Sequence, residues 1–203
     1  MSDELLKHEY IYVPWVKSER KSELAVQIAV HLQQHYRAPL TVVVTRKPDV
    51  PDALSRWPSV SERSGYAEDG GVVLAYYPTY KVLEKIQHLE ASVIVMLEWA
   101  TDPQLGWARL HDAYNAVTGE VMHSGLTDDN RETLDRIVFE GYKGWHDDIA
   151  ERMTLSWLED LDQAAAYHRE LVLAFARQTN SEPNIERLVK ILDRFEASRA
   201  SAR

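Results

Sequence analysis

The fold is indicated by Ser92-Val-Ile-Val-Met-Leu97, the most continuously apolar stretch of the 203-residue chain. An unbroken apolar run is typical of a central strand in a parallel sheet, because helices cover such a strand on both faces. Three further short apolar runs occur at 10–14, 40–44 and 72–76. Helical patterns separate the four runs, and this alternation predicts an α/β domain over about residues 8–122. We expect an open, Rossmann-like parallel sheet of four to five strands flanked by helices.

The segments between these strands predict helices and one long loop. Leu24, Ile28 and Leu32 recur at four-residue spacing, which predicts a helix over 18–37. Further helices are predicted over 80–89 and 102–117.

Proline and glycine concentrate between Thr45 and Gly71, which predicts a long loop there with a short helix near 52–56. A loop of this length is uncommon in a compact domain and is often functional. A brief strand at 120–122 would close the domain.

The chain beyond residue 126 is helical in pattern throughout. Because amphipathic helices need a surface to cover, this all-helical C-terminal region (126–200) either packs on the sheet domain or forms a homodimer. Its helices are predicted over 127–140, 147–161, 162–179 and 185–200.

Composition narrows the class of protein. The absence of cysteine excludes disulfides, thiolate metal sites and cysteine nucleophiles. A net charge of −9 makes nucleic acid an improbable partner, since its binding rests on phosphate neutralisation by Lys and Arg. The longest apolar run is far shorter than the ~20 residues of a membrane span, and the acidic, polar start differs from a signal peptide. We therefore expect a cytoplasmic protein that makes no membrane contact.

Parallel sheets usually bind ligands at the carboxyl ends of their strands, yet no phosphate loop, dinucleotide fingerprint or nucleophile elbow stands at these ends. No cofactor can be assigned on this basis. Basic residues do gather there. Lys17 and Lys21 stand at the start of the first helix, and Arg46 and Lys47 follow the second strand. They predict a site for a small anion, with a solvated basic edge as the alternative.

Aromatic and acidic residues follow the next strands. Tyr77 and Tyr80 come after the third strand, where they could stack on a base or pack the strand-to-helix turn. Glu98 ends the most buried strand and is the best candidate for a general base, with a salt bridge to Arg46 or Lys47 as the alternative. Trp15, Trp57 and Trp99, at strand ends or in the long loop, could line a pocket or a partner surface.

Histidines and acids do not form a metal pattern. His31 and His35 share a helix face but lack the glutamate of zinc peptidases. In His146-Asp147-Asp148, the two acids are explained as first-turn residues that complement the dipole of the helix they open, with a metal site as the alternative. We predict no metal site.

Three functions are compatible with these features. The first is a non-enzymatic binding or regulatory protein that engages a protein partner, which predicts an exposed apolar patch. The second is an enzyme or sensor for a small phosphate-bearing ligand at the carboxyl edge of the sheet, which predicts a pocket containing the basic residues. The third, a nucleic-acid-associated remnant of a helicase-like protein, is disfavoured by the net charge.

Overall fold

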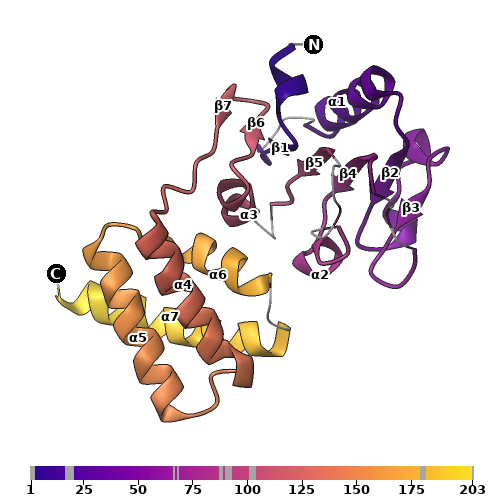
Figure 1. The fold of residues 1–203 in the computed structure, drawn as a ribbon. Helices are drawn as coiled ribbons and strands as arrows, with labels where there is room; N and C mark the ends of the chain where they lie inside the picture. Colours follow the sequence, from indigo (N-terminus) through magenta and orange to yellow (C-terminus); the bar gives the residue numbers. More distant parts are fainter. Residues whose placement is uncertain are drawn as a thin grey trace. The chain divides into compact units, whose positions relative to one another are not determined.

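A computed structural model describes residues 3–16, 21–65, 67, 69–86, 89, 93–100, 104–178 and 182–202. The chain divides into two compact units, Met1–His123 and Ser124–Arg203 (Figure 1).

The first unit is an α/β unit built on a seven-stranded sheet in the order β3-β2-β4-β5-β1-β6-β7. All neighbouring strands run parallel except β6 and β7, which are antiparallel. The expectation of four to five strands is therefore wrong, because short strands extend the sheet at both edges. The strands are β1 (Tyr10–Val13), β2 (Leu40–Val43), β3 (Ser59–Val60), β4 (Val72–Tyr76), β5 (Val93–Leu97), β6 (Tyr114–Asn115) and β7 (Glu120–Val121).

The apolar residues Val93–Leu97 form β5, which occupies the centre of the sheet. Its side chains alternate between two separate cores, as the period of a strand requires. Val95 and Leu97 face a core that contains the buried face of helix α1 (Lys21–Tyr36). Ile94 and Met96 face a second core with α2 (Tyr80–Leu83) and α3 (Leu105–Leu110). Helices thus cover both faces of the central strand.

Helix α1 makes the crossover that sets the strand order. It leaves β1, contacts β4 and β5, and delivers the chain to β2. Two strands that come later in the sequence are therefore inserted between β1 and β2.

Two predicted helices are much shorter than expected. The helix predicted over 80–89 is α2, which ends at Leu83, and the one predicted over 102–117 is α3, within 105–110. The predicted start at Asp102-Pro103 lies outside the described residues. The second helix ends at Leu110, and Asp112 shortly after it has a φ of 47°, which interrupts the helical path. Beyond it, the Asn115 side chain accepts hydrogen bonds from the N–H groups of Val117 and Thr118, which shapes the hairpin turn between β6 and β7.

The long segment 45–71 is more ordered than a loop. It contains the short 3₁₀ helices η2 (Lys47–Asp49) and η3 (Asp52–Leu54) followed by strand β3. η3 lies where the short helix near 52–56 is predicted, whereas η2 and β3 are too short to show a periodic pattern in the sequence.

The second unit is helical. It comprises α4 (Asp128–Glu140), η4 (Gly141–Lys143), α5 (Asp148–Gln163), α6 (Arg169–Arg177) and α7 (Glu182–Ala202). The 3₁₀ helix η1 (Asp3–Lys7), by contrast, precedes β1 and belongs to the first unit. The side chains of Thr127 and Asp147 accept hydrogen bonds from backbone N–H groups at the starts of α4 and α5. The predicted helix over 162–179 is wrong at its start, because Ala165 has a φ of 54° and interrupts the helical path.

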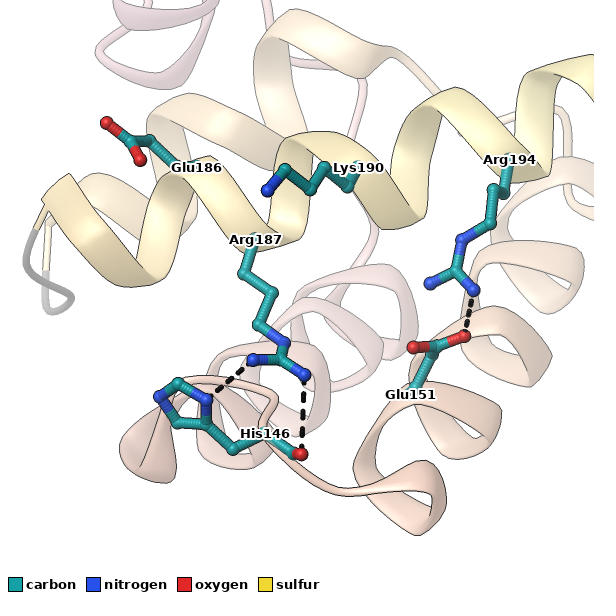
Figure 2. A pocket seen from close by; sticks show the side chains of 6 residues that line it. All are labelled: His146, Glu151, Glu186, Arg187, Lys190 and Arg194. Atoms are coloured by element: carbon teal, nitrogen blue, oxygen red, sulfur yellow. Dashed lines mark hydrogen bonds and ion pairs between the residues drawn. The ribbon is translucent and has the colours of Figure 1, made fainter.

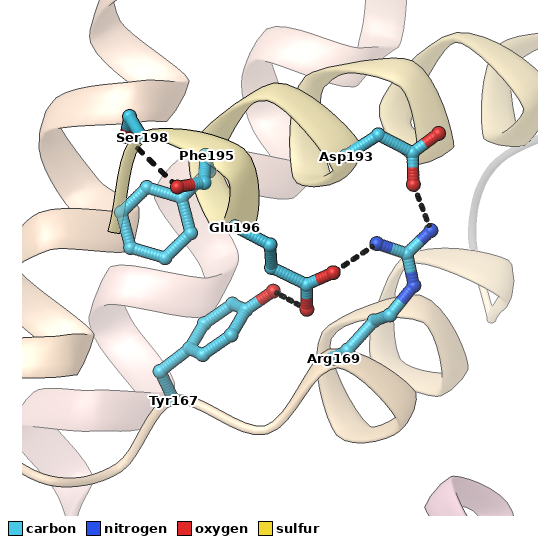
Figure 3. A network of polar contacts seen from close by, with 6 residues as sticks. All are labelled: Tyr167, Arg169, Asp193, Phe195, Glu196 and Ser198. Atoms are coloured by element: carbon cyan, nitrogen blue, oxygen red, sulfur yellow. Dashed lines mark hydrogen bonds and ion pairs between the residues drawn. The ribbon is translucent and has the colours of Figure 1, made fainter. Parts of the chain in front are cut away.

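A polar network fastens the start of α6 to α7 (Figure 3). The guanidinium of Arg169 donates to Asp193 at 2.7 Å and to Glu196 at 2.8 Å, and the Tyr167 hydroxyl donates to Glu196 at 2.8 Å. Burial raises the pKa of Tyr167, and the hydrogen bond to Glu196 raises it further. Ser198 also donates to the Phe195 carbonyl. The network positions α6, the shorter of these two helices, on the unit's apolar core.

His111 makes the first unit sensitive to acid. Its ring lies 4.5 Å from that of Tyr10 and 4.9 Å from that of Trp107, and burial lowers its pKa from 6.5 to about 4. The His111 imidazole is therefore protonated near pH 6.5 in the unfolded chain but only near pH 4 in the folded unit. Stability is complete above pH 6.5 and falls as the pH drops through this window, by about 2–3 kcal/mol.

Urea unfolding at pH 7.5, 6, 5 and 4 tests this expectation. His111→Gln should flatten the pH dependence, whereas His35→Gln, on the exposed part of α1, should leave it unchanged. Equal slopes for the wild type and His111→Gln would contradict the assignment.

None of the helices within the described ranges combines the length and the apolar character that crossing a membrane requires.

Candidate functional site

The strand order separates the predicted site residues into two groups. Arg46 follows β2 and Glu98 follows β5, and β4 lies between these two strands. Glu98 does not pair with Arg46, whose guanidinium instead donates to Asp49 at 2.9 and 3.1 Å. The predicted general base and the predicted anion-binding residues thus belong to different parts of the carboxyl edge.

Glu98 holds two connecting segments together. Its side chain is 9% exposed, and its two oxygens accept the backbone N–H groups of Trp15 at 3.0 Å and Gln104 at 2.9 Å. Burial raises the pKa of Tyr12, and a hydrogen bond with Glu98 adds to this effect. With both oxygens engaged by donors of the fold, the carboxylate links the segments that follow β1 and β5.

Directly around this contact, three aromatic side chains surround a hollow of about 280 Å³, which we call the aromatic hollow: Trp15, Tyr77 and Trp99. The rings of Tyr77 and Trp99 are 5.2 Å apart in an edge-to-face arrangement. Trp15 is 45% and Trp99 48% exposed, so much of the apolar surface of both rings faces solvent. The aromatic hollow lies at the carboxyl ends of β1, β4 and β5, where parallel sheets usually bind ligands.

A second hollow, of about 540 Å³, lies at the carboxyl ends of β2 and β3, and we call it the basic hollow. Its floor is continuous with the sheet, because the N–H of Val44 donates to the carbonyl of Val60 at 2.9 Å and the N–H of Glu62 to that of Thr45 at 3.3 Å. The lining residues are Thr45, Arg46, Lys47, Pro48, Ser61, Glu62, Arg63 and Ser64.

Positive charge in the basic hollow is only partly neutralised. The hydrogen bond between Arg46 and Asp49 raises the pKa of the guanidinium and lowers that of the carboxyl group. Glu62 is the acid of the lining, and it interacts with two residues that do not line the hollow: it accepts a hydrogen bond from the Thr79 hydroxyl at 2.7 Å, and it lies 4.0 Å from the Lys81 ammonium group.

The two remaining cations of the hollow, Lys47 and Arg63, are exposed. Neither has a hydrogen-bond or ion-pair partner among the side chains that the structure describes. The hydroxyl groups of Ser61 and Ser64 are hydrogen-bonded to each other at 3.0 Å, so the groups of this hollow that can bind an anion are the two cations.

The two hollows meet at one contact. The Thr45 hydroxyl, in the lining of the basic hollow, donates to the backbone carbonyl of Tyr77, in the lining of the aromatic hollow, at 3.3 Å. They lie side by side on the carboxyl edge of the sheet.

The other predicted site residues lie elsewhere. Lys17 is outside the described residues, and Lys21 begins α1 after β1 and does not line the basic hollow. Tyr80 opens α2 and packs against the core beneath that helix. Arg63 was not among the predicted site residues, because the segment that contains strand β3 was predicted as a loop. The β-branched Val60 after Pro58-Ser59 was the one feature of the sequence that indicated a strand there.

The helical unit has its own hollow, of about 480 Å³, between α7 and the start of α5 (Figure 2). Figure 2 shows Arg187 reaching His146 and Arg194 paired with Glu151. Its lining mixes these cations and Lys190 with two acids, Glu151 and Glu186, so opposite charges compete for any ion that enters. It is a weaker candidate than the basic hollow.

Within the described part of the chain, no three His, Asp or Glu side chains are grouped so that they could hold a metal ion.

Comparison of the chain with protein-family models, with curated proteins and with solved structures finds no match.

Proposed function

We propose that this protein, with its Rossmann-like sheet, is a cytoplasmic, non-catalytic binder of a small phosphate-bearing ligand at the carboxyl edge of that sheet. The observation that carries the proposal is the basic hollow, in whose lining Lys47 and Arg63 have no hydrogen-bond or ion-pair partner among the described side chains. Its volume lies within the range of small-molecule sites, and its location is the usual one for ligands of parallel sheets.

Binding is favoured over catalysis because of Glu98. A general base must lie within hydrogen-bond reach of the proton that it removes. Both oxygens of Glu98 accept hydrogen bonds from the backbone, and β4 separates its strand from the basic hollow. Glu98 therefore supports the edge of the sheet and does not contact a ligand in the basic hollow.

Calorimetric titration with ribose 5-phosphate at low salt tests the proposal. The wild type should bind it saturably. Lys47→Ala and Arg63→Ala should each weaken binding about tenfold, since a charge-assisted hydrogen bond contributes about 1.5–3 kcal/mol. The double variant should bind at least thirtyfold more weakly.

Lys143→Ala is the matched control, because it removes one exposed positive charge from the other unit. It should change the affinity less than twofold. Absence of saturable binding by the wild type, or unchanged affinity in the double variant, would disprove the proposal.

A protein partner is the second candidate, and one observation favours it. Phe139 at the end of α4, Tyr142 in η4 and Ile149 at the start of α5 are 76%, 84% and 63% exposed. Helices α4 and α5 are in contact and joined by a short connection, so these residues lie at the same end of the pair. Exposed apolar groups gathered in this way are common at protein interfaces, including those of homodimers. A helicase-like role on nucleic acid is supported by neither hollow and remains disfavoured by the net charge.

A further inference from the structure

We infer that the ligand is a mononucleotide, whose phosphate occupies the basic hollow while its base occupies the aromatic hollow. This inference rests on the proposed function and names the chemical class of its ligand. A mononucleotide combines a dianionic phosphate with a flat aromatic base, and the carboxyl edge offers a complement to each.

The first support is the contact between the hollows. The hydrogen bond from Thr45 to Tyr77 joins the lining of one hollow to that of the other. Strands β2 and β4, which lead into these residues, are neighbours about 4.8 Å apart. In the sheet order, the strand that leads to Lys47 lies one spacing from the strand that leads to Tyr77 and two spacings, about 10 Å, from the strand that leads to Trp99. This separation is comparable with the length of an extended mononucleotide.

The second support is the backbone of Tyr77. Its φ of 50° lies in the left-handed region, which is unfavourable for a bulky side chain. Strain of this kind persists only where the surroundings enforce it, and it gathers at ligand sites. Here the N–H of Tyr77 donates to the carbonyl of Leu97 at 3.1 Å, and the ring stands against Trp99. This backbone conformation places the ring of Tyr77 in the lining of the aromatic hollow.

The third support is that the aromatic hollow is preorganised yet open. Glu98 fixes the backbone of Trp15, and the indole ring of that residue remains 45% exposed. A base that stacks on exposed rings gains contact area without displacing side chains from a core. Base–aromatic stacking of this kind strengthens binding about tenfold or more per base.

The experiment compares three probes: ribose 5-phosphate, adenosine and adenosine 5′-monophosphate. We expect the monophosphate to bind at least tenfold more tightly than ribose 5-phosphate, and to quench tryptophan fluorescence. Trp99→Ala and Trp15→Ala should lower its affinity to that of ribose 5-phosphate, without changing the affinity for ribose 5-phosphate itself. Trp99→Leu retains apolar contact but not stacking, and it should lose most of the gain.

The control is Tyr142→Ala, which removes an exposed aromatic ring of the other unit and should leave all affinities unchanged. Equal affinity for ribose 5-phosphate and the monophosphate would overturn the nucleotide inference and leave the proposed function standing. A tenfold gain that persists in both tryptophan variants would overturn it as well. No binding of either phosphate compound would overturn both.

Discussion

Replacement of Glu98 by alanine is expected to lower the free energy of unfolding of the α/β unit by about 3–5 kcal/mol. The substitution leaves the N–H groups of Trp15 and Gln104 without their acceptor. Each donor left unsatisfied in a buried position costs about 1–3 kcal/mol. Urea denaturation followed by circular dichroism measures the change.

Two variants make the result specific. Glu98→Gln keeps one oxygen acceptor and should lose about half as much stability. Glu120→Ala removes an exposed acid from β7 and should stay within about 0.5 kcal/mol of the wild type. If Glu98→Ala were as stable as Glu120→Ala, the carboxylate would not hold the edge of the sheet, and a role as a general base would regain support.

Replacement of Trp145 by alanine is expected to cost the helical unit about 3–5 kcal/mol. Trp145 is fully buried in the core formed by α4, α5, α6 and α7, and its removal leaves a large cavity. Gly141 lies directly against its indole ring, so a Cβ atom at that position would collide with the ring. Gly141→Ala alone should therefore cost about 1–3 kcal/mol through overpacking.

The double variant separates these two effects. With the indole absent, the added methyl group meets no obstacle, so Gly141→Ala should cost much less in the Trp145→Ala background than in the wild type. Tyr142→Ala, next to Gly141 but 84% exposed, should change stability by no more than about 0.5 kcal/mol. Strictly additive costs in the double variant would show that the glycine is not required by the tryptophan.

Much of the secondary structure could be predicted from local pattern. Strands of four or five residues with continuous apolar side chains, such as β4 and β5, lie where the sequence places them. Helix α4 begins where Thr127 caps it, because the capping contact involves residues only three positions apart. The two-residue strands β3 and β6 could not be predicted, since two residues carry no periodicity and are held by their neighbours in the sheet.

The candidate site could be predicted only in part. The rule that ligands bind at the carboxyl ends of parallel strands selected Arg46 and Lys47, which line the basic hollow. It could not select Arg63, which reaches the same hollow through β3. Nor could it show that Glu98 is occupied, because its donors lie at positions 15 and 104, and Trp15 is 83 residues away in the chain.

The sequence by itself determined the α/β class of the first unit, the helical character of the second and the central place of Val93–Leu97, because these follow from the spacing of apolar residues along the chain. Only the tertiary structure decided which chemical groups meet. Helix α1 connects β1 to β2 and crosses β5 and β4, which lie between these two strands in the sheet. This crossover keeps Glu98 apart from Arg46 and brings Thr45 against Tyr77. Strand order depends on how distant segments pack on one helix, and no local spacing of residues encodes it.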